Sequence, residues 1–239
     1  MGMSQLAVTA RCPELDRILT GQPAVGASGA ANKPRSTVKP ELAQTLYETL
    51  LSEAPVSVIE IGMAFGASSL AILAALAELN APNSGLISVD PKQTERWDRS
   101  GALAVERAGY SKWHTLIEEA DYEALPALLR QGKRFQFGYI DGWHTFDYTL
   151  LDFFYIDRML DVGGIAAFND CSWPAVDKVL RFVVSHRKYE EISVGLKRIP
   201  AGDTRWQRLR AGFEGRQAQD RYFRKTADWE PNWDFFSAF

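Results

Sequence analysis

The chain has few of the residues on which disulfide scaffolds and zinc modules depend. Its 239 residues include two cysteines and three histidines. Cys12 and Cys171 lie far apart in the sequence, so a structural disulfide is not expected and a reducing cytoplasm is the predicted compartment. Clusters of histidine and cysteine at zinc-ligand spacing are also absent, so a zinc module is not expected.

The sequence also lacks a long apolar run and an excess of positive charge. No segment approaches the length of a membrane span, and the N-terminus MGMSQLAVTARC has no apolar core typical of a signal peptide. The formal net charge of −3 leaves no basic footprint of the kind that nucleic-acid-binding proteins carry. We therefore expect a cytoplasmic protein without nucleic-acid or membrane partners.

What is present is a regular alternation of strand and helix patterns in a chain long enough for one α/β domain with additions. Short apolar runs predict strands, and segments with helical spacing separate them after a first helix over 40–52. Such alternation is typical of a parallel sheet wound by right-handed crossovers. The predicted strands are 56–61, 85–90, 113–118, 135–140 and 164–169, and the predicted helices between and after them are 67–79, 94–109, 122–131, 146–160 and 174–187.

The pattern changes near both ends of the chain. Residues 1–38 are rich in Gly, Ala, Ser and Pro, which predicts a mobile arm; simple disorder and an active-site cover both remain open. After a domain over 39–215, Tyr189–Leu196 and Arg205–Arg210 flank a turn-rich stretch and predict a terminal hairpin. The aromatic tail 216–239 is expected to dock on its own domain or, in a homodimer, on a second subunit.

One stretch, VSVIEIGMAFGASSL at 56–70, joins a buried strand to a glycine turn and a helix. Gly62 and Gly66 let the backbone turn tightly and approach a ligand where a Cβ would be in the way. Ser68 and Ser69 open a helix whose free N–H groups point back at the turn. A nucleoside-bearing small molecule is the expected ligand.

The spacing of Glu60, Gly62 and Gly66, E-x-G-x-x-x-G, differs from the dinucleotide fingerprint G-x-G-x-x-G. It resembles the first motif of the class I S-adenosylmethionine (SAM)-dependent methyltransferases. The resemblance implies a Rossmann-like, doubly wound α/β fold with seven strands, mostly parallel with an antiparallel last strand, and helices on both faces. The implied cofactor contacts in this stretch are Glu60, Gly62, Met63, Ala64, Gly66, Ser68 and Ser69. Glu60 alternatively serves as a structural acid that satisfies loop N–H groups.

Further acids follow the second and third predicted strands. Asp90 ends the second strand, where a carboxylate commonly accepts hydrogen bonds from both ribose hydroxyls of a nucleoside. The alternative for Asp90 is a helix N-cap before Pro91. Glu118, Glu119 and Asp121 follow the third strand, where the resemblance places contacts to the adenine edge; among these positions Glu119 and Ala120 are the predicted contacts.

Three oxygen-bearing side chains follow the next two strands. Asp141 ends the fourth strand, and Asn169 and Asp170 end the fifth. Because neighbouring parallel strands lie about 4.8 Å apart, these side chains are expected to converge at one edge of the sheet. Two carboxylates and an amide carbonyl suit a hard cation such as Mg²⁺.

The motifs around these residues carry a narrower resemblance. Y-I-D-G-x-H, then L-x-x-G-G, then [DN]-D-x-x-W-P-x-V are similar to the macrocin-type sugar O-methyltransferases and, more remotely, to the catechol-type O-methyltransferases. The resemblance covers 56 to about 185 and implies that Asp141, Asn169 and Asp170 hold a metal, with Asp141 also near the cofactor. Many members have two aspartates where this chain has Asn169, and one fewer negative charge should weaken Mg²⁺ binding. The alternative for Asp141 and Asp170 is a role as loop caps and cofactor contacts.

His144 lies three residues after Asp141, at the position of a catalytic lysine in the catechol-type pattern. With an unperturbed pKa of about 6.5, it offers a neutral fraction near pH 7 that removes a hydroxyl proton. A positioning or purely structural role is the alternative. His114 and His186 are predicted to be structural, Cys171 to be a small loop residue, and Trp143 and Trp173 to form either substrate walls or packing.

The sequence therefore predicts a SAM-dependent enzyme that methylates a hydroxyl oxygen of a small molecule, with His144 and Asp141 as catalytic residues and Mg²⁺ assistance. Two alternatives remain open. One is an NAD-type oxidoreductase, against which the missing third glycine counts. The other is a cofactor-binding methyltransferase-like protein without activity.

Overall fold

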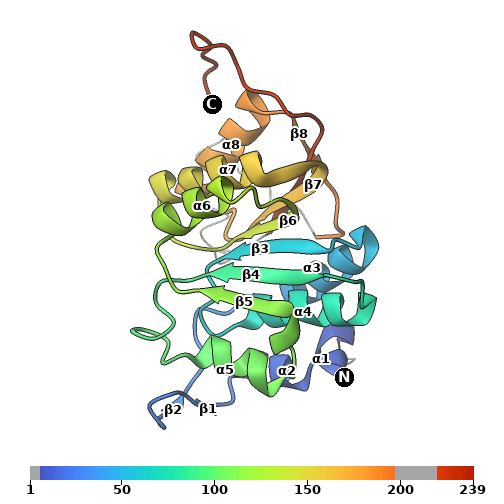
Figure 1. Cartoon of the computed structure of the whole chain (residues 1–239), viewed down its shortest axis with the longest axis vertical. Coiled ribbons are helices and arrows are strands. Elements are labelled where there is room, and N and C mark those ends of the chain that lie inside the picture. The colour runs from blue at the N-terminus through green and yellow to red at the C-terminus, as the bar shows by residue number, and fades with distance from the viewer. Residues whose placement is uncertain (1–5, 197–219) are drawn as a thin grey trace, which may run out of the picture.

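The fold is described from a computed structural model, which places residues 6–196 and 220–239. A single seven-stranded sheet lies at its centre (Figure 1). In order across the sheet its strands are β5 (His114–Ile117), β4 (Gly85–Val89), β3 (Ser57–Ile61), β6 (Phe135–Ile140), β7 (Leu160–Phe168), β9 (Arg221–Lys225) and β8 (Tyr189–Ile192).

The strand directions confirm the predicted mostly parallel sheet with an antiparallel last strand. The neighbours from β5 to β7 are all parallel, and β9 is antiparallel to both β7 and β8. Strand β8 pairs with Arg221–Lys225, and its predicted hairpin partner Arg205–Arg210 lies outside the described residues. Tyr222 and Phe223 are fully buried on opposite faces of the sheet, which favours a position of β9 inside the sheet rather than in a tail.

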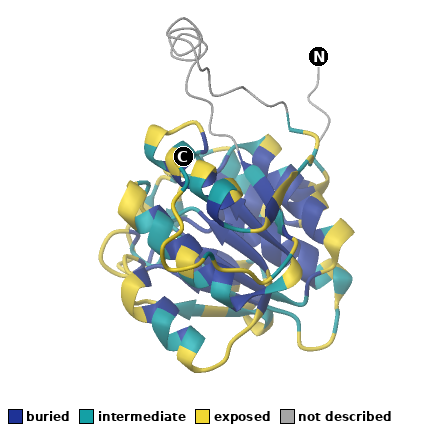
Figure 2. Ribbon diagram, turned by 90° about the horizontal axis from the view of Figure 1, so that it is seen from above, coloured by how far each residue is buried: buried dark blue, intermediate teal, exposed yellow. Residues whose placement is uncertain are grey.

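Helices cover both faces of the sheet, as predicted. One face packs against α3 (Pro40–Glu53), α4 (Ala67–Leu79) and α5 (Ser100–Arg107), and the other against α6 (Asp121–Arg130), α7 (Phe146–Met159) and α8 (Pro174–His186). Successive residues of β3 show the alternation, since Val58 faces the first group and Ile59 the second. Figure 2 shows the resulting buried strands between partly exposed helices.

Helix α4, which opens at the glycine turn, is apolar on every side. All residues from Ala67 to Leu76 are buried, because α4 packs on the sheet and is covered in turn by α3 and by α2 (Pro13–Leu19). A helix with this pattern is stable only in the interior of a protein. Its N-terminus is therefore fixed rigidly beneath the turn at 62–66.

Residues 7–19 differ from the expectation of a mobile arm. They form α1 (Ala7–Arg11) and α2, and Val8, Leu15 and Ile18 are buried in the core. Helices this short give no clear periodicity in the sequence, since they are stabilised by packing rather than by their own length. A small hairpin of β1 (Ala24–Val25) and β2 (Ala31–Asn32) follows and leads the chain to the cavity described below.

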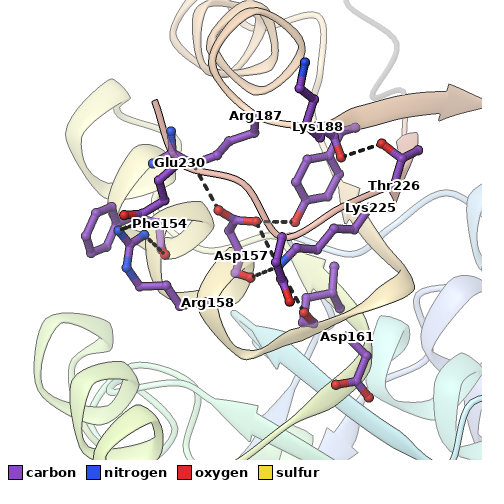
Figure 3. Close-up of polar contacts among 12 residues, drawn as sticks. Phe154, Asp157, Arg158, Asp161, Arg187, Lys188, Lys225, Thr226 and Glu230 are labelled. Carbon is purple, nitrogen blue, oxygen red and sulfur yellow. Dashed lines mark hydrogen bonds and ion pairs between the residues drawn. The ribbon is translucent and has the colours of Figure 1, made fainter. Parts of the chain in front are cut away.

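Strand β9 is held to α7 by a buried polar cluster (Figure 3). The Lys225 ammonium, only 4% exposed, donates to the backbone oxygen of Asp157 at 2.6 Å. The Asp157 carboxylate accepts from Arg187 Nε at 3.0 Å and from the Tyr189 hydroxyl at 2.8 Å. Arg221–Lys225 is thus part of the sheet, and the segment that follows the sheet begins after Lys225 rather than at the predicted boundary of 216.

The aromatic residues of that last segment lie against α8. The Phe239 ring contacts the rings of Phe182 and His186 at centroid distances of 5.4 and 5.1 Å, and the Phe235 ring contacts His186 at 5.3 Å. Trp233 is 97% exposed. Among the helices of 6–196 and 220–239, none combines the length and apolar character needed to cross a membrane.

Candidate active site at the carboxyl edge of the sheet

A cavity of about 670 Å³ lies at the edge of the sheet where the parallel strands end. The residues that follow β3, β4, β6 and β7 line it, together with the start of α6 and the segment 36–38 from the N-terminal region. The ends of neighbouring parallel strands meet at this edge, which is where α/β sheets bind ligands. Most of the predicted site residues from both halves of the sequence therefore line one cavity; Glu60, Gly66, Ser69 and Glu119 do not.

The glycine turn forms one wall of this cavity through Gly62, Met63, Ala64 and Ser68. Gly62 has φ +85°, and a Cβ there would lie 2.2 Å from the backbone oxygen of Asp141. Gly66 has φ +82° and is the N-cap of α4, whose first N–H groups open toward the turn. Both glycines are thus required by the backbone, and Gly62 is required by the close approach of the chain after β6 as well.

Asp90 organises the turn from the end of β4. Its carboxylate accepts hydrogen bonds from the backbone N–H groups of Met63, Ala64 and Lys92 at 3.1, 2.8 and 2.8 Å, and from Gln93 Nε2 at 2.9 Å. Three of these bonds end on Oδ2 and one on Oδ1, so Oδ1 keeps an acceptor position for a ligand. Asp90 lines the cavity and is 4% exposed, and its contact with a ribose stays a prediction.

Glu60 is absent from the residues that line the cavity, and its partners are serine hydroxyls rather than the loop N–H groups of its structural alternative. It is fully buried, and its carboxylate accepts from Ser69 Oγ at 2.5 Å and Ser88 Oγ at 2.7 Å. Burial raises its pKa to about 7, against the effect of these hydroxyl donors. Ser88 Oγ also lies 3.0 Å from His114 Nε2, so His114 belongs to this buried network, and burial lowers its pKa to about 4.

After the third strand, Ala120 and Asp121 line the cavity, whereas Glu119 is an exposed residue outside the cavity wall. Asp121 is the first residue of α6 and is buried. The contacts of Glu119 and Ala120 with an adenine stay predictions.

Behind Asp121 lies a second acid, Asp152 of α7, which sequence reasoning missed. Asp152 is completely buried, and burial together with the charge of Asp121 raises its pKa well above the usual range. Its carboxyl lies beneath the chain after β6, since a Cβ on Gly142 would be 3.4 Å from Asp152 Oδ2. The environment favours the neutral form of this carboxyl.

The chain after β6 and the chain after β7 bring together Asp141, His144 and Asp170. His144 Nε2 lies 3.3 Å from Asp141 Oδ1 and 3.2 Å from Asp170 Oδ2. The His144 ring also packs on Trp173 at a centroid distance of 5.4 Å, which fixes its orientation. Sequence reasoning placed these three residues correctly at one edge, but it assigned the acids and the histidine to separate tasks.

The three groups shift one another's pKa values. Burial raises the pKa of Asp141 to about 6, while the hydrogen bond and charge of His144 act in the opposite direction. Burial alone would lower the pKa of His144, but the hydrogen bond and charge of Asp141 and the charge of Asp170 outweigh it and raise the pKa. The neutral fraction of His144 near pH 7 is therefore smaller than an unperturbed histidine would offer.

The same three residues fit a divalent cation. One carboxylate oxygen each from Asp141 and Asp170 and a ring nitrogen of His144 lie within 4.8 Å of one another. The predicted ligand Asn169 also lines the cavity, and its Nδ2 donates to Asp220 at 2.8 Å. A site that includes imidazole suits Mn²⁺ or Fe²⁺ as well as Mg²⁺, and metal binding itself stays a prediction.

Two tryptophans and a cysteine complete the surroundings. Trp143 and Trp173 line the cavity and are 57% and 42% exposed, so they stand at its mouth and not in the core. Cys171 is buried, its Sγ donates to the Phe168 oxygen at 3.0 Å, and burial raises its pKa well above the usual range. A thiol in this state is a poor nucleophile, in keeping with a small loop residue.

Comparison with known proteins agrees with this site. Residues 59–171 match the family described as a methyltransferase domain. Among solved structures, the chain is similar to the O-methyltransferase from Bacillus cereus in complex with SAH, with 14% identity, a TM-score of 0.65, and coverage of 89% of this chain and 91% of that one. It is also similar to the O-methyltransferase TomG from Streptomyces achromogenes in complex with SAM, with 14% identity, a TM-score of 0.64, and coverage of 94% and 92%.

No curated protein matches the chain significantly. At these identities the solved structures support only the fold. The family match covers the segment that contains both the glycine turn and the acid–histidine cluster. The resemblance predicted from the motifs is confirmed to this extent: residues 59–171 match the methyltransferase-domain family, and the chain has the fold of the solved O-methyltransferases.

Proposed function

We propose that this protein transfers the methyl group of SAM to a hydroxyl oxygen of a small molecule. The observation that carries the proposal is the single cavity that the glycine turn shares with Asp141, His144 and Asp170. A methyl donor held at the turn would lie beside groups that bind and deprotonate an acceptor. Methyl transfer requires little more than alignment of donor and acceptor and an acceptor oxygen that has lost its proton.

The residues that would hold the cofactor come from three strand ends. Gly62, Met63 and Ala64 offer a backbone wall, and the N–H groups at the start of α4 favour a carboxylate such as that of the methionine moiety. Asp90 shapes this wall and is proposed to approach the ribose. Ala120 and Asp121 line the part of the cavity expected to receive the adenine.

His144 is the proposed general base, and Asp141 and Asp170 are its partners. Both carboxylates lie within 3.3 Å of Nε2, so they stabilise the imidazolium that forms when the ring takes the acceptor's proton. A divalent cation held by Asp141, Asn169 and Asp170 would lower the pKa of a bound hydroxyl and leave His144 free to take its proton. The exposed rings of Trp143 and Trp173 at the mouth favour an acceptor with a flat or sugar-like face.

Location and assembly belong to the same proposal. Cys12 and Cys171 are both buried and unpaired, which suits a reducing cytoplasm. A second subunit over the exposed part of the aromatic tail stays a prediction.

Calorimetry with S-adenosylhomocysteine, the product of SAM after methyl transfer, tests the cofactor directly. We expect saturable binding at one site per chain, and a thermal-shift scan in which SAM raises the melting temperature and NAD does not. Radiolabelled SAM incubated with a library of phenols, catechols and sugars, with and without EDTA, then tests the reaction. Absence of heat with S-adenosylhomocysteine, or stabilisation by NAD instead, would refute the proposal; binding without transfer to any hydroxyl would favour a protein that has lost the activity.

A further inference from the structure

Asp220 is a buried carboxylate that neither the glycine turn nor the acid–histidine cluster uses. It is 4% exposed and directly precedes β9. Because β9 runs antiparallel to β7, with Arg221 opposite Phe168, the start of β9 lies beside the end of β7. This places Asp220 next to Asn169, although the two residues are 51 positions apart in the sequence.

The carboxylate of Asp220 is surrounded by donors. Asn169 Nδ2 donates to Oδ1 at 2.8 Å, and the hydroxyls of Tyr139 and Tyr222 donate to Oδ2 at 3.0 and 3.3 Å. Both tyrosines are fully buried, Tyr139 in β6 and Tyr222 in β9, so the carboxylate itself is held in one place. Two donors from strands and one from the residue after β7 thus converge on one side chain.

The orientation of the Asn169 amide follows from this partner. An asparagine side chain has an NH₂ end that donates and an oxygen end that accepts, and a carboxylate only accepts. The amide must therefore turn its NH₂ toward Asp220 and its oxygen away from it. Since Asn169 lines the cavity that Asp141 and Asp170 also line, the oxygen is the end that remains for a ligand there.

We infer that Asp220 is a positioning residue, which keeps the amide oxygen of Asn169 turned toward the cavity as a further ligand for a divalent cation beside Asp141 and Asp170. Many similar proteins have a second aspartate where this chain has Asn169. Here the carboxylate belongs to Asp220, which lies behind the Asn169 amide and is hydrogen-bonded to it. This inference rests on the proposed function, because it concerns the same cavity. Binding of a cation by these residues can be measured without measuring catalysis.

The test uses Mn²⁺ as the probe and the full-length protein. In Asp220→Asn, the new amide no longer forces Asn169 to donate, so Asn169 is free to reverse. We expect Mn²⁺ affinity, measured by titration calorimetry, to fall at least tenfold, which is the usual loss when a residue that orients a metal ligand is removed. Binding of S-adenosylhomocysteine should change less than twofold, because the glycine turn is untouched.

Two further variants make the result specific. The exchange Asn169→Asp with Asp220→Asn restores the hydrogen bond with donor and acceptor reversed and turns a charged oxygen toward the cavity, so Mn²⁺ affinity should return to at least the wild-type value. Tyr222→Phe, the matched control, removes a donor to the same carboxylate at 3.3 Å without touching Asn169, and should leave Mn²⁺ affinity within twofold.

The inference is overturned if wild-type protein binds no Mn²⁺, if Asp220→Asn binds it as well as wild type, or if the exchange variant does not recover. Equal losses of Mn²⁺ binding, S-adenosylhomocysteine binding and melting temperature in Asp220→Asn would also overturn it, because they indicate a purely structural residue. The proposed function fails separately, when wild-type protein binds no S-adenosylhomocysteine.

Discussion

The two halves of the cavity edge both carry acids at strand ends, yet they use them in opposite ways. At β3 and β4, the carboxylates of Glu60 and Asp90 accept hydrogen bonds from serine hydroxyls and backbone N–H groups of their own chain. At β6 and β7, Asp141 and Asp170 face His144 and the cavity. Both pairs hold the chain in place, but only Asp90 of the first pair lines the cavity, whereas both acids of the second pair do.

This difference explains why position at a strand end does not by itself assign a role to an acid. Fixed donors occupy most of the acceptor positions of Asp90, and Glu60 accepts its serine hydroxyls on Oε2 while its buried Oε1 has no hydrogen-bond partner within the described residues. An acid that is buried beside another charged group keeps a perturbed pKa, which is typical of functional sites. We therefore assign shape and cofactor binding to the β3–β4 half, and proton and cation chemistry to the β6–β7 half.

The largest expected effect comes from removing the base of the β6–β7 half. His144→Ala should lower kcat by about 10²- to 10⁴-fold, the usual contribution of a general base. Affinity for S-adenosylhomocysteine should change less than twofold, because the β3–β4 half is intact. Because neighbouring carboxylates raise the pKa of His144, wild-type kcat should increase as pH rises through and above 6.5, and the variant should lose this limb.

The matched control is His186→Gln. His186 lies at the end of α8, where its ring stacks on Phe182 at 4.7 Å, and it is remote from the cavity wall. The substitution His186→Gln should reduce the melting temperature slightly and leave kcat unchanged. If His144→Ala kept its activity, or lost cofactor affinity and kcat together, the division of labour between the halves would be broken.

An intermediate effect is expected where the two halves touch. Gly62→Ala introduces a Cβ 2.2 Å from the backbone oxygen of Asp141, at φ +85°. We expect the free energy of unfolding to fall by more than ~3 kcal/mol, since a left-handed residue costs about 1–2 kcal/mol and the backbone contact must also be relieved. Urea unfolding measures the loss, and calorimetry with S-adenosylhomocysteine should show weaker binding.

Gly163→Ala separates these two contributions. Gly163 has φ +89°, and a Cβ there would meet nothing within 4 Å. The free energy of unfolding of Gly163→Ala should fall by only about 1–2 kcal/mol, the cost of the left-handed conformation alone. Equal losses in the two variants would mean that the turn and the end of β6 do not depend on their close contact.

Much of the fold was predictable because its signals are local. Apolar runs and helical spacing located β3 to β7 and the helices between them, and the glycine turn located the cofactor half of the edge. The pairing of β8 with β9 was not predictable in this way. Its partner lies beyond 197–219, and what selects it is burial of Tyr222 and Phe223 in the finished sheet.

The sequence predicted which residues meet at the candidate site better than it predicted what each of them does there. Asp141, His144 and Asp170 follow strands that the sequence identifies, so their meeting could be expected. The Asp90 carboxylate accepts hydrogen bonds from its own chain, and the Asp220 carboxylate is inferred to orient the Asn169 amide. Both arrangements depend on donors that approach from other strands and loops. Tertiary packing determines which donors reach these carboxylates, so the motifs around the carboxylates do not predict them.

The smallest expected effect concerns the buried acid beneath the β6–β7 half. Asp152 is completely buried, and burial and the charge of Asp121 raise its pKa well above the value of about 3.9 expected in the unfolded chain. Above pH 4 the folded protein must then keep a proton that the unfolded chain releases. Stability contributed by this carboxyl is therefore present below pH 4 and lost as pH rises.

Asp152→Asn removes that penalty, because an amide carries no proton to lose. Urea unfolding should show little difference from wild type near pH 4 and a gain on the order of 1 kcal/mol, the scale of one pKa unit, at pH 8. Asp147→Asn on the same helix is the matched control: its pKa is lowered by a hydrogen bond from Thr145, so it should show no such gain at high pH. A gain for Asp152→Asn that is equal at both pH values would show that proton binding is not its cause.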